Sequence, residues 1–268
     1  MTSGTKSKAQ RRAELQRKAA ERRAAELRAK RMRLAFRYGG AVVAILVIVL
    51  IIVLATGGSS NPPSSKTAAD VKTEPIPASL QMIADPPTTP GAEGIPIPEG
   101  TKLATLSTAA TGQSVDGIQC NAGEKTVTHV HTHLTIFVNG KARIIPYGVG
   151  IPGNTAVQTP EGPFVETGSC FYWLHTHAED GIIHVESPST SETFTLGQFF
   201  AEWGVPLSST QVGPATGTQT VFFAAPGKKV GIYKGDPANL PLGDHYQIQI
   251  DVGTPIVKPV NITNWGQL

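Results

Sequence analysis

The chain has 268 residues, of which 40% are hydrophobic and 16% charged, and it carries a net charge of +3 and two cysteines. This balance hides an asymmetry, because residues 1–37 hold 13 Lys and Arg against 3 Glu and the rest of the chain is therefore acidic. The composition changes near residues 38, 58 and 115, which excludes a single uniform domain, and the pI of the whole chain describes neither half.

Residues 1–37 predict a basic cytoplasmic helix. The stretch from Ala9 to Met32 is rich in helix-favouring residues, and Glu14 with Lys18 has the i, i+4 spacing that supports an exposed helix. Positive charge beside a hydrophobic segment favours contact with anionic lipid headgroups. A basic run alone is a weak signal for nucleic-acid binding, so we expect no nucleic-acid partner.

Residues 38–58 predict a single transmembrane helix. They contain no charged residue, and about 21 residues of helix extend roughly 31 Å, enough to cross a bilayer. A signal peptide cleaved near Ala55 is the competing interpretation, but the long charged region in front of the apolar run argues against it. The positive-inside rule places residues 1–37 in the cytoplasm and the C-terminal part outside the plasma membrane.

Residues 59–114 predict a spacer, because Pro, Gly, Ser, Thr and Ala dominate them. Such a composition has too little apolar surface to offset its ordering entropy. Parts of the segment Ile95–Leu106 are the candidates in this spacer for packing against the domain that follows.

Residues 115–268 predict a mainly β domain, an antiparallel sandwich or barrel with one short helix. Asn139-Gly140 is suited to a tight hairpin turn, and Thr195 with Gln198 has the spacing of a capping box for a helix that Gly204 ends. The expected strands are short apolar or alternating runs between turn signals, at Thr126–Val138, Ala142–Pro146, Cys170–His177, Ile182–Glu186, Thr220–Ala225, Lys229–Tyr233 and Tyr246–Val252.

Both cysteines, Cys120 and Cys170, lie in the part expected outside the cell, and we predict that they form a disulfide. Each lies shortly before a histidine-rich run, so the bond would hold the two runs together. The bond would close a loop of about 50 residues, which stabilises the fold by about 4 kcal/mol in the chain-entropy model.

Six of the seven histidines lie between residues 129 and 184. Side chains in a β-strand alternate between two faces, so His129, His131 and His133 are expected on one face and Val130 and Leu134 on the other.

A second histidine run should fold against the first. A turn at residues 178–181 is expected to bring His175 opposite His184, with Glu186 on the same face. Three imidazoles and one carboxylate then converge.

This convergence predicts a transition-metal site, because imidazoles two residues apart on a strand face can bind one ion. The expected ligands are His131, His133, His175, His177 and His184, with His129, Glu186, Glu179 and Asp180 as further ligands or as groups that orient the rings. Imidazole shells with an occasional carboxylate suit zinc, copper, nickel or iron, of which we expect zinc or copper. Ligating imidazoles must be neutral, so the affinity is expected to fall as the pH drops below about 6.5. His245 is expected to be unrelated to the site.

The alternative is a non-catalytic domain that binds a ligand or a protein, with the histidines in a structural network. In that case Thr128, Thr132, Thr135 and Thr176 would hydrogen-bond the rings across the strands. An exposed aromatic patch would favour this alternative, and buried rings would weaken it. The rings concerned are Phe171, Tyr172, Trp173, Phe199, Phe200 and Trp203.

The sequence contains no nucleophile-elbow serine, phosphate-binding glycine loop or H-E-x-x-H motif, so the common hydrolase and nucleotide-binding classes are not supported. Whether a metal at this site would be catalytic stays open, and protein partners are not indicated.

Three motifs together resemble an uncharacterised family of bacterial exported or membrane-anchored proteins. They are VTHVHTHLTIFVNG (127–140), CFYWLHTHAEDGIIHVESP (170–188) and FTLGQFFAEWG (194–204). The resemblance covers roughly residues 114–253, which implies that the β domain is the functional unit. It implies no particular activity.

Overall fold

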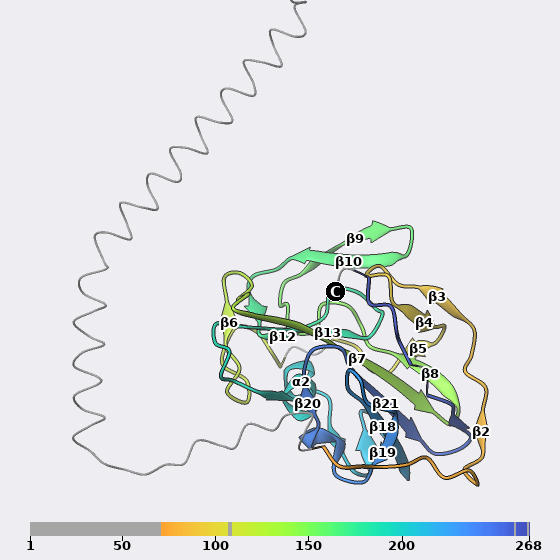
Figure 1. Ribbon diagram of the computed structural model, residues 1–268. Coiled ribbons are helices and arrows are strands. Elements are labelled where there is room, and N and C mark those ends of the chain that lie inside the picture. The colour runs from red at the N-terminus through yellow and green to blue at the C-terminus, as the bar shows by residue number, and fades with distance from the viewer. Residues whose placement is uncertain (1–70, 107–108, 260, 267) are drawn as a thin grey trace, which may run out of the picture. The chain divides into compact units, whose positions relative to one another are not determined.

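The computed structural model describes residues 71–106, 109–259, 261–266 and 268 (Figure 1). The predicted basic helix (1–37), the predicted transmembrane helix (38–58) and the start of the predicted spacer lie outside these residues. Within the described ranges, no helix has the length and apolar character needed to cross a membrane.

The described part is mainly β, as predicted, and its largest element is a sheet of nine strands. Seven of them lie side by side in the order β1-β19-β18-β21-β7-β13-β12, while β8 pairs with β7 and β5 with β8. Their bounds are β1 (Thr73–Glu74), β5 (Thr101–Lys102), β7 (Thr128–Val138), β8 (Lys141–Ile144), β12 (Leu174–His175), β13 (Ile182–Ser187), β18 (Gln219–Ala224), β19 (Gly231–Tyr233) and β21 (Tyr246–Val252).

The sheet is mixed, which corrects the prediction of a purely antiparallel arrangement. β7 pairs in parallel with β21, and β5 pairs in parallel with β8. Apolar and polar residues alternate with the same period in both kinds of ladder. The alternation in the sequences of β7 and β21 therefore did not reveal that these two strands pair in parallel.

Strand β7 positions the candidate site, because it is paired on both edges. One edge carries β21, and the other carries β13 along its first half and β8 along its second half (Figure 1). The predicted hairpin joins β7 to β8, and Asn139 and Gly140 have φ angles of 50° and 72°. Two positive φ angles in a two-residue loop match the strand twist, so this prediction is confirmed.

The main core covers one face of the sheet. Leu134 and Ile136 of β7 point into it, whereas His131 and His133 point to the other face, as the alternation predicted. Helix α2 (Leu196–Trp203) packs Phe199, Phe200 and Trp203 into the same core.

Helix α2 confirms the predicted capping box. The Thr195 side chain accepts a hydrogen bond from the backbone N–H of Gln198, and the Gln198 side chain accepts one from the backbone N–H of Thr195. Gly204 ends the helix with a φ of 70°. Both ends of the helix are therefore encoded locally.

The remaining strands form small sheets of two or three strands each, and η2 (Pro237–Asn239) is a short 3-10 helix. The β9–β10 hairpin was not predicted, because its first strand is polar and mostly exposed. These elements are β2 (Met82–Ile83), β3 (Thr88–Pro90), β4 (Pro96–Pro98), β6 (Cys120–Asn121), β9 (Thr155–Thr159), β10 (Gly162–Thr167), β11 (Phe171–Tyr172), β14 (Phe194–Thr195), β15 (Leu207–Ser208), β16 (Gln211–Val212), β17 (Ala215–Thr216), β20 (Pro241–Leu242), β22 (Ile256–Val257) and the 3-10 helix η2 (Pro237–Asn239).

Residues 71–106, which the sequence analysis placed in the spacer, belong to this fold. β1 pairs with β19, β2 with β22 and β5 with β8. Ile95 and Leu103 are buried, so docking of Ile95–Leu106 is observed. A Pro-rich segment is extended, and an extended segment can add to a sheet edge, but the partners lie too far along the chain for composition to reveal them.

The predicted disulfide is present between Cys120 and Cys170. Cys120 lies in β6, and Cys170 directly precedes β11, the strand with which β6 pairs. The bond therefore fixes the entrance to the second histidine run.

Candidate metal centre

The pairing of three strands brings the histidines together. His175 of β12 lies opposite His184 of β13, as predicted, and His184 lies opposite His131 of β7. One step along, Glu186 lies opposite His129. Residues directly opposite each other in a sheet share a face, so these side chains form two short rows across one surface.

Four buried side chains are close enough to hold a metal ion. His175, His177, His184 and Glu186 each offer a ligand atom, and these atoms all lie within 4.8 Å of one another. All four residues are buried, with exposed fractions from 0% to 6%. We call them the buried cluster.

Two rings of the buried cluster have their tautomers fixed by the backbone. His175 Nδ1 lies 2.8 Å from the carbonyl oxygen of Tyr172, and His177 Nδ1 lies 2.5 Å from that of Val165. A carbonyl only accepts, so each Nδ1 must carry the donated proton. In a neutral ring, Nε2 is then a bare acceptor.

The two bare nitrogens face each other. His175 Nε2 and His177 Nε2 lie 3.2 Å apart. Burial, followed by the charge of His184, lowers the pKa of both rings, that of His175 well below its usual value, so neither ring carries a second proton at neutral pH. Two lone pairs at this distance repel unless a cation lies between them.

His184 presents its other nitrogen to the buried cluster. Its Nε2 lies 2.6 Å from Glu93 Oε1 and donates to it, while Nδ1 lies 3.7 Å from Glu186 Oε1. Burial alone would lower the pKa of His184, but the carboxylates of Glu186 and Glu93 outweigh it and raise the pKa to about 9. His184 Nδ1 and Glu186 Oε2 are buried, and no described residue hydrogen-bonds to either.

The sequence analysis missed two side chains beside the buried cluster. One is Glu124, whose Oε1 lies 3.6 Å from His177 Nε2, and the other is Glu93. The side chain of Glu93 is 6% exposed, and its backbone N–H donates to Asp180 Oδ2 at 3.0 Å. Burial raises the pKa of Glu93, but the hydrogen bond to His184, the charges of His184 and His177 and the hydrogen bond to Asp180 together outweigh burial and lower the pKa. Glu93 lies in the expected spacer, 91 residues before its partner, and no local signal marks it.

A second group shares His184. His129, His131 and His184 also offer ligand atoms within 4.8 Å of one another, but His129 is exposed. Burial and then the charges of His184 and His129 lower the pKa of His131 to about 3. His129 Nε2 lies 3.1 Å from Glu186 Oε1, so it orients a carboxylate of the buried cluster.

Three residues expected near the metal lie outside both groups. His133 Nε2 donates to the carbonyl oxygen of Asp180 at 3.0 Å, and burial lowers the pKa of His133 to about 4. The Asp180 side chain accepts from the backbone of Glu93, and Glu179 pairs with Lys102 at 2.6 Å. The alternation along β7 places His133 on the same face as His131. However, His131 lies opposite His184, whereas His133 lies two residues further along, opposite Ile182. His245 stacks on Trp265 and belongs to neither group, as expected, although its backbone N–H donates to the carbonyl oxygen of His131 at 2.7 Å.

Comparison with known proteins assigns no family to this geometry, because no family model, curated protein or solved structure matches the chain. The resemblance of the three motifs to exported bacterial proteins therefore stays a prediction.

The six aromatic side chains named in the alternative interpretation, all of which the structure describes, do not form an exposed patch. Tyr172, Phe199, Phe200 and Trp203 are at most 1% exposed. Phe171 and Trp173 are partly buried, and the Phe171 ring lies against His175, 5.8 Å between ring centres. The alternative interpretation, an interaction domain that uses these rings as its binding surface, therefore loses support.

The spacing in the buried cluster suits a small metal ion. With metal–nitrogen bonds of about 2.0–2.1 Å, two ligands of a tetrahedral zinc ion are roughly 3.3 Å apart. The Nε2 atoms of His175 and His177, at 3.2 Å, have this separation. The Glu186 oxygen lies 4.0 Å from His175 Nε2 and 3.7 Å from His184 Nδ1, both longer than this separation.

Proposed function

We propose that this chain is a membrane-anchored, extracytoplasmic protein that binds one zinc or copper ion in the buried cluster. The ligands are Nε2 of His175, Nε2 of His177, Nδ1 of His184 and a carboxylate oxygen of Glu186.

The contact between His175 and His177 carries this proposal. A structural histidine network would place a proton between two imidazole nitrogens 3.2 Å apart. Here both ring protons are donated to carbonyl oxygens on the far sides of the rings. Metal-binding histidines commonly have this arrangement, because the second hydrogen bond fixes the tautomer and turns the free nitrogen to the ion.

Glu93 supports the same proposal from the other side. A carboxylate that accepts from the far nitrogen of a ligating imidazole orients the ring and increases its basicity. Glu93 stands in this relation to His184.

Four protein ligands fill a tetrahedral shell, which is typical of sites that bind or store an ion or stabilise a fold. Sites that hydrolyse substrates usually keep one position for water. We therefore place metal binding ahead of catalysis. Three nitrogens and one oxygen suit zinc or copper(II).

The location outside the membrane rests on the charge pattern and the predicted apolar span of residues 1–58. The disulfide supports it, because such bonds persist in oxidising compartments.

Elemental analysis of the purified full-length chain tests the proposal. We expect about one zinc or copper per chain for the wild type and for His245→Asn, and at least a tenfold loss of metal for His177→Ala. His245 is the matched control because it lies outside both groups. Equal metal content in the two variants would contradict the proposal.

A further inference from the structure

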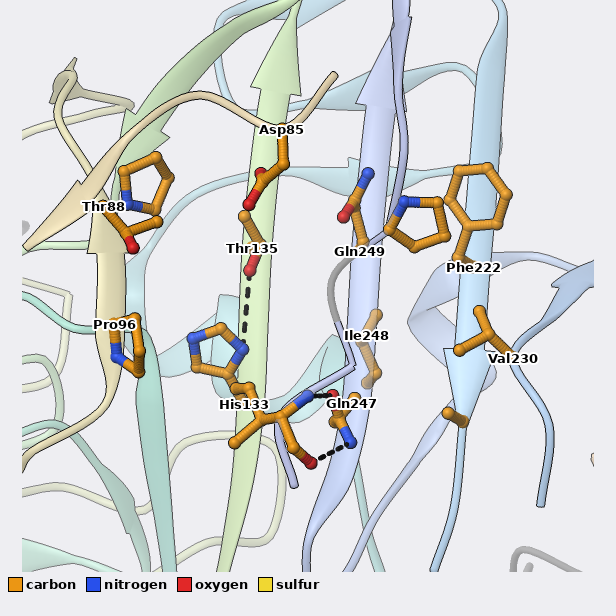
Figure 2. A pocket seen from close by; sticks show the side chains of 14 residues that line it. Asp85, Thr88, Pro96, His133, Thr135, Phe222, Val230, Gln247, Ile248 and Gln249 are labelled. Carbon is orange, nitrogen blue, oxygen red and sulfur yellow. Dashed lines mark hydrogen bonds between the residues drawn. The ribbon is translucent and has the colours of Figure 1, made fainter. Parts of the chain in front are cut away.

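A pocket of about 160 Å³ lies on the same sheet face as the histidines (Figure 2). Its floor is formed by β7, β21 and β18. Residues of the segment from Asp85 to Pro98 and the C-terminal residues Pro259 and Ile262 cover it. An apolar cavity of roughly 150 Å³ accommodates a benzene ring.

The walls of the pocket are largely apolar. Phe222 and Val230 line one side and Pro96 lines the other (Figure 2), and Pro98 also lines the pocket. Burying a single-ring molecule against such walls is favourable, because the molecule loses apolar surface to water.

His133 supplies a hydrogen-bond acceptor. Its Nε2 must carry the proton, because it donates to the Asp180 carbonyl. Its Nδ1 is then an acceptor, and Thr135 Oγ1 approaches it only to 3.4 Å, a long hydrogen bond (Figure 2). A ligand with a hydroxyl group could bind Nδ1 more closely.

Gln249 supplies a second acceptor. Both protons of its amide nitrogen are used, in hydrogen bonds to Asp251 Oδ2 at 2.8 Å and to the carbonyl oxygen of Val257 at 2.9 Å. These partners fix the orientation of the amide, so Oε1 is the free end. No described residue donates to Oε1.

Gln247, the next polar residue on this face, is already satisfied. Its Nε2 donates to Asn261 and to the Ile262 carbonyl, and its Oε1 accepts from the Ile262 backbone. The free polar atoms that His133 and Gln249 offer to the pocket, Nδ1 and Oε1, are therefore both acceptors.

We propose that this pocket binds a single-ring apolar molecule that carries a hydrogen-bond donor, of the phenol class. The ring fills the apolar volume, and the hydroxyl group donates to His133 Nδ1 or Gln249 Oε1. This inference does not depend on the buried cluster holding a metal.

Calorimetric titration of the full-length chain with phenol and with fluorobenzene tests the proposal. The two probes have nearly the same shape, but only phenol donates. We expect saturable binding of phenol at least about tenfold tighter than that of fluorobenzene, since a site built for a hydrogen bond rejects the analogue that lacks it. Equal binding of both probes, or no saturable binding of phenol, would overturn the proposal.

Filling the pocket provides the matched comparison. Val230→Phe should weaken phenol binding at least about tenfold, whereas Val127→Phe adds the same ring at a position 63% exposed outside the pocket and should leave binding unchanged. If Val230→Phe does not fold, the imidazole resonances of His133 in the wild type decide. Phenol should shift them whichever acceptor takes its hydroxyl group, because His133 lines the pocket and the bound ring lies beside it, and fluorobenzene should need at least about tenfold higher concentration for the same shift. A His133 that phenol leaves unshifted would refute the proposal.

Discussion

His175 Nε2 lies 3.2 Å from His177 Nε2, although each ring donates its only proton to a backbone carbonyl on the opposite side. The repulsion between the two lone pairs falls if one ion accepts both. The hydrogen bonds to Tyr172 and Val165 hold the rings in this arrangement whether or not an ion is bound. The cluster is therefore organised before it binds, which reduces the entropy lost on binding.

Removal of the metal should lower the melting temperature of the full-length chain. An ion bound at about 100 times its dissociation constant stabilises the folded state by about 2.7 kcal/mol, or roughly 5–10 °C for a protein of this size. Differential scanning calorimetry with and without a chelator measures the shift. Restoring zinc or copper should reverse it, and an unchanged melting temperature would argue against a metal in the cluster.

Glu93→Gln should weaken metal binding by about 10- to 100-fold with little change in the fold. The amide oxygen can still accept from His184 Nε2, but it lacks the charge that increases the basicity of the ring. Glu99→Gln is the matched control, because Glu99 lies on the same segment and is exposed. Competition with a metal-sensitive dye gives the two affinities, and similar values would mean that Glu93 does not act through His184.

Metal affinity should rise with pH. Without metal, the pKa of His184 is raised to about 9, so the ring carries both protons at neutral pH, and the ion must displace the proton on Nδ1. The pKa values of His175 and His177 are lowered, so these two rings are already mainly neutral at pH 7 and the dependence comes mainly from His184. Affinity should therefore increase roughly tenfold per unit between about pH 6 and pH 8. The sequence alone predicted a loss only below about 6.5. If the metal affinity does not change between pH 6 and pH 8, His184 is excluded as a ligand.

Replacing both cysteines with serine should lower the free energy of unfolding by about 4 kcal/mol in the chain-entropy model, because the bond closes a loop of 50 residues. Urea denaturation of the variant and of the oxidised wild type measures the difference. Metal affinity should fall as well, since Cys170 lies at the start of the run that contains His175 and His177. Wild-type stability in the variant would show that the bond does not constrain the fold.

The features that sequence could predict are those encoded within a few residues. The capping box at Thr195, the turn at Asn139-Gly140 and the alternation of histidines along β7 all have local spacing rules. The pairing of His175 with His184 followed from the short connection between them.

The features that sequence could not predict depend on distant partners. Glu93 reaches the site only because its segment packs against Asp180, and β21 lies parallel to β7 through a connection of more than 100 residues. His133 shows what the alternation along β7 cannot predict. The alternation places His133 on the same face as His131, but it does not tell which of the two histidines lies close to the buried cluster.

X-ray absorption spectroscopy of the metal-loaded full-length chain tests the central claim most directly. The account predicts three imidazole nitrogens and one carboxylate oxygen at about 2.0–2.1 Å from a zinc or copper ion. A shell with fewer than two imidazoles, or one built only from oxygen, would contradict it.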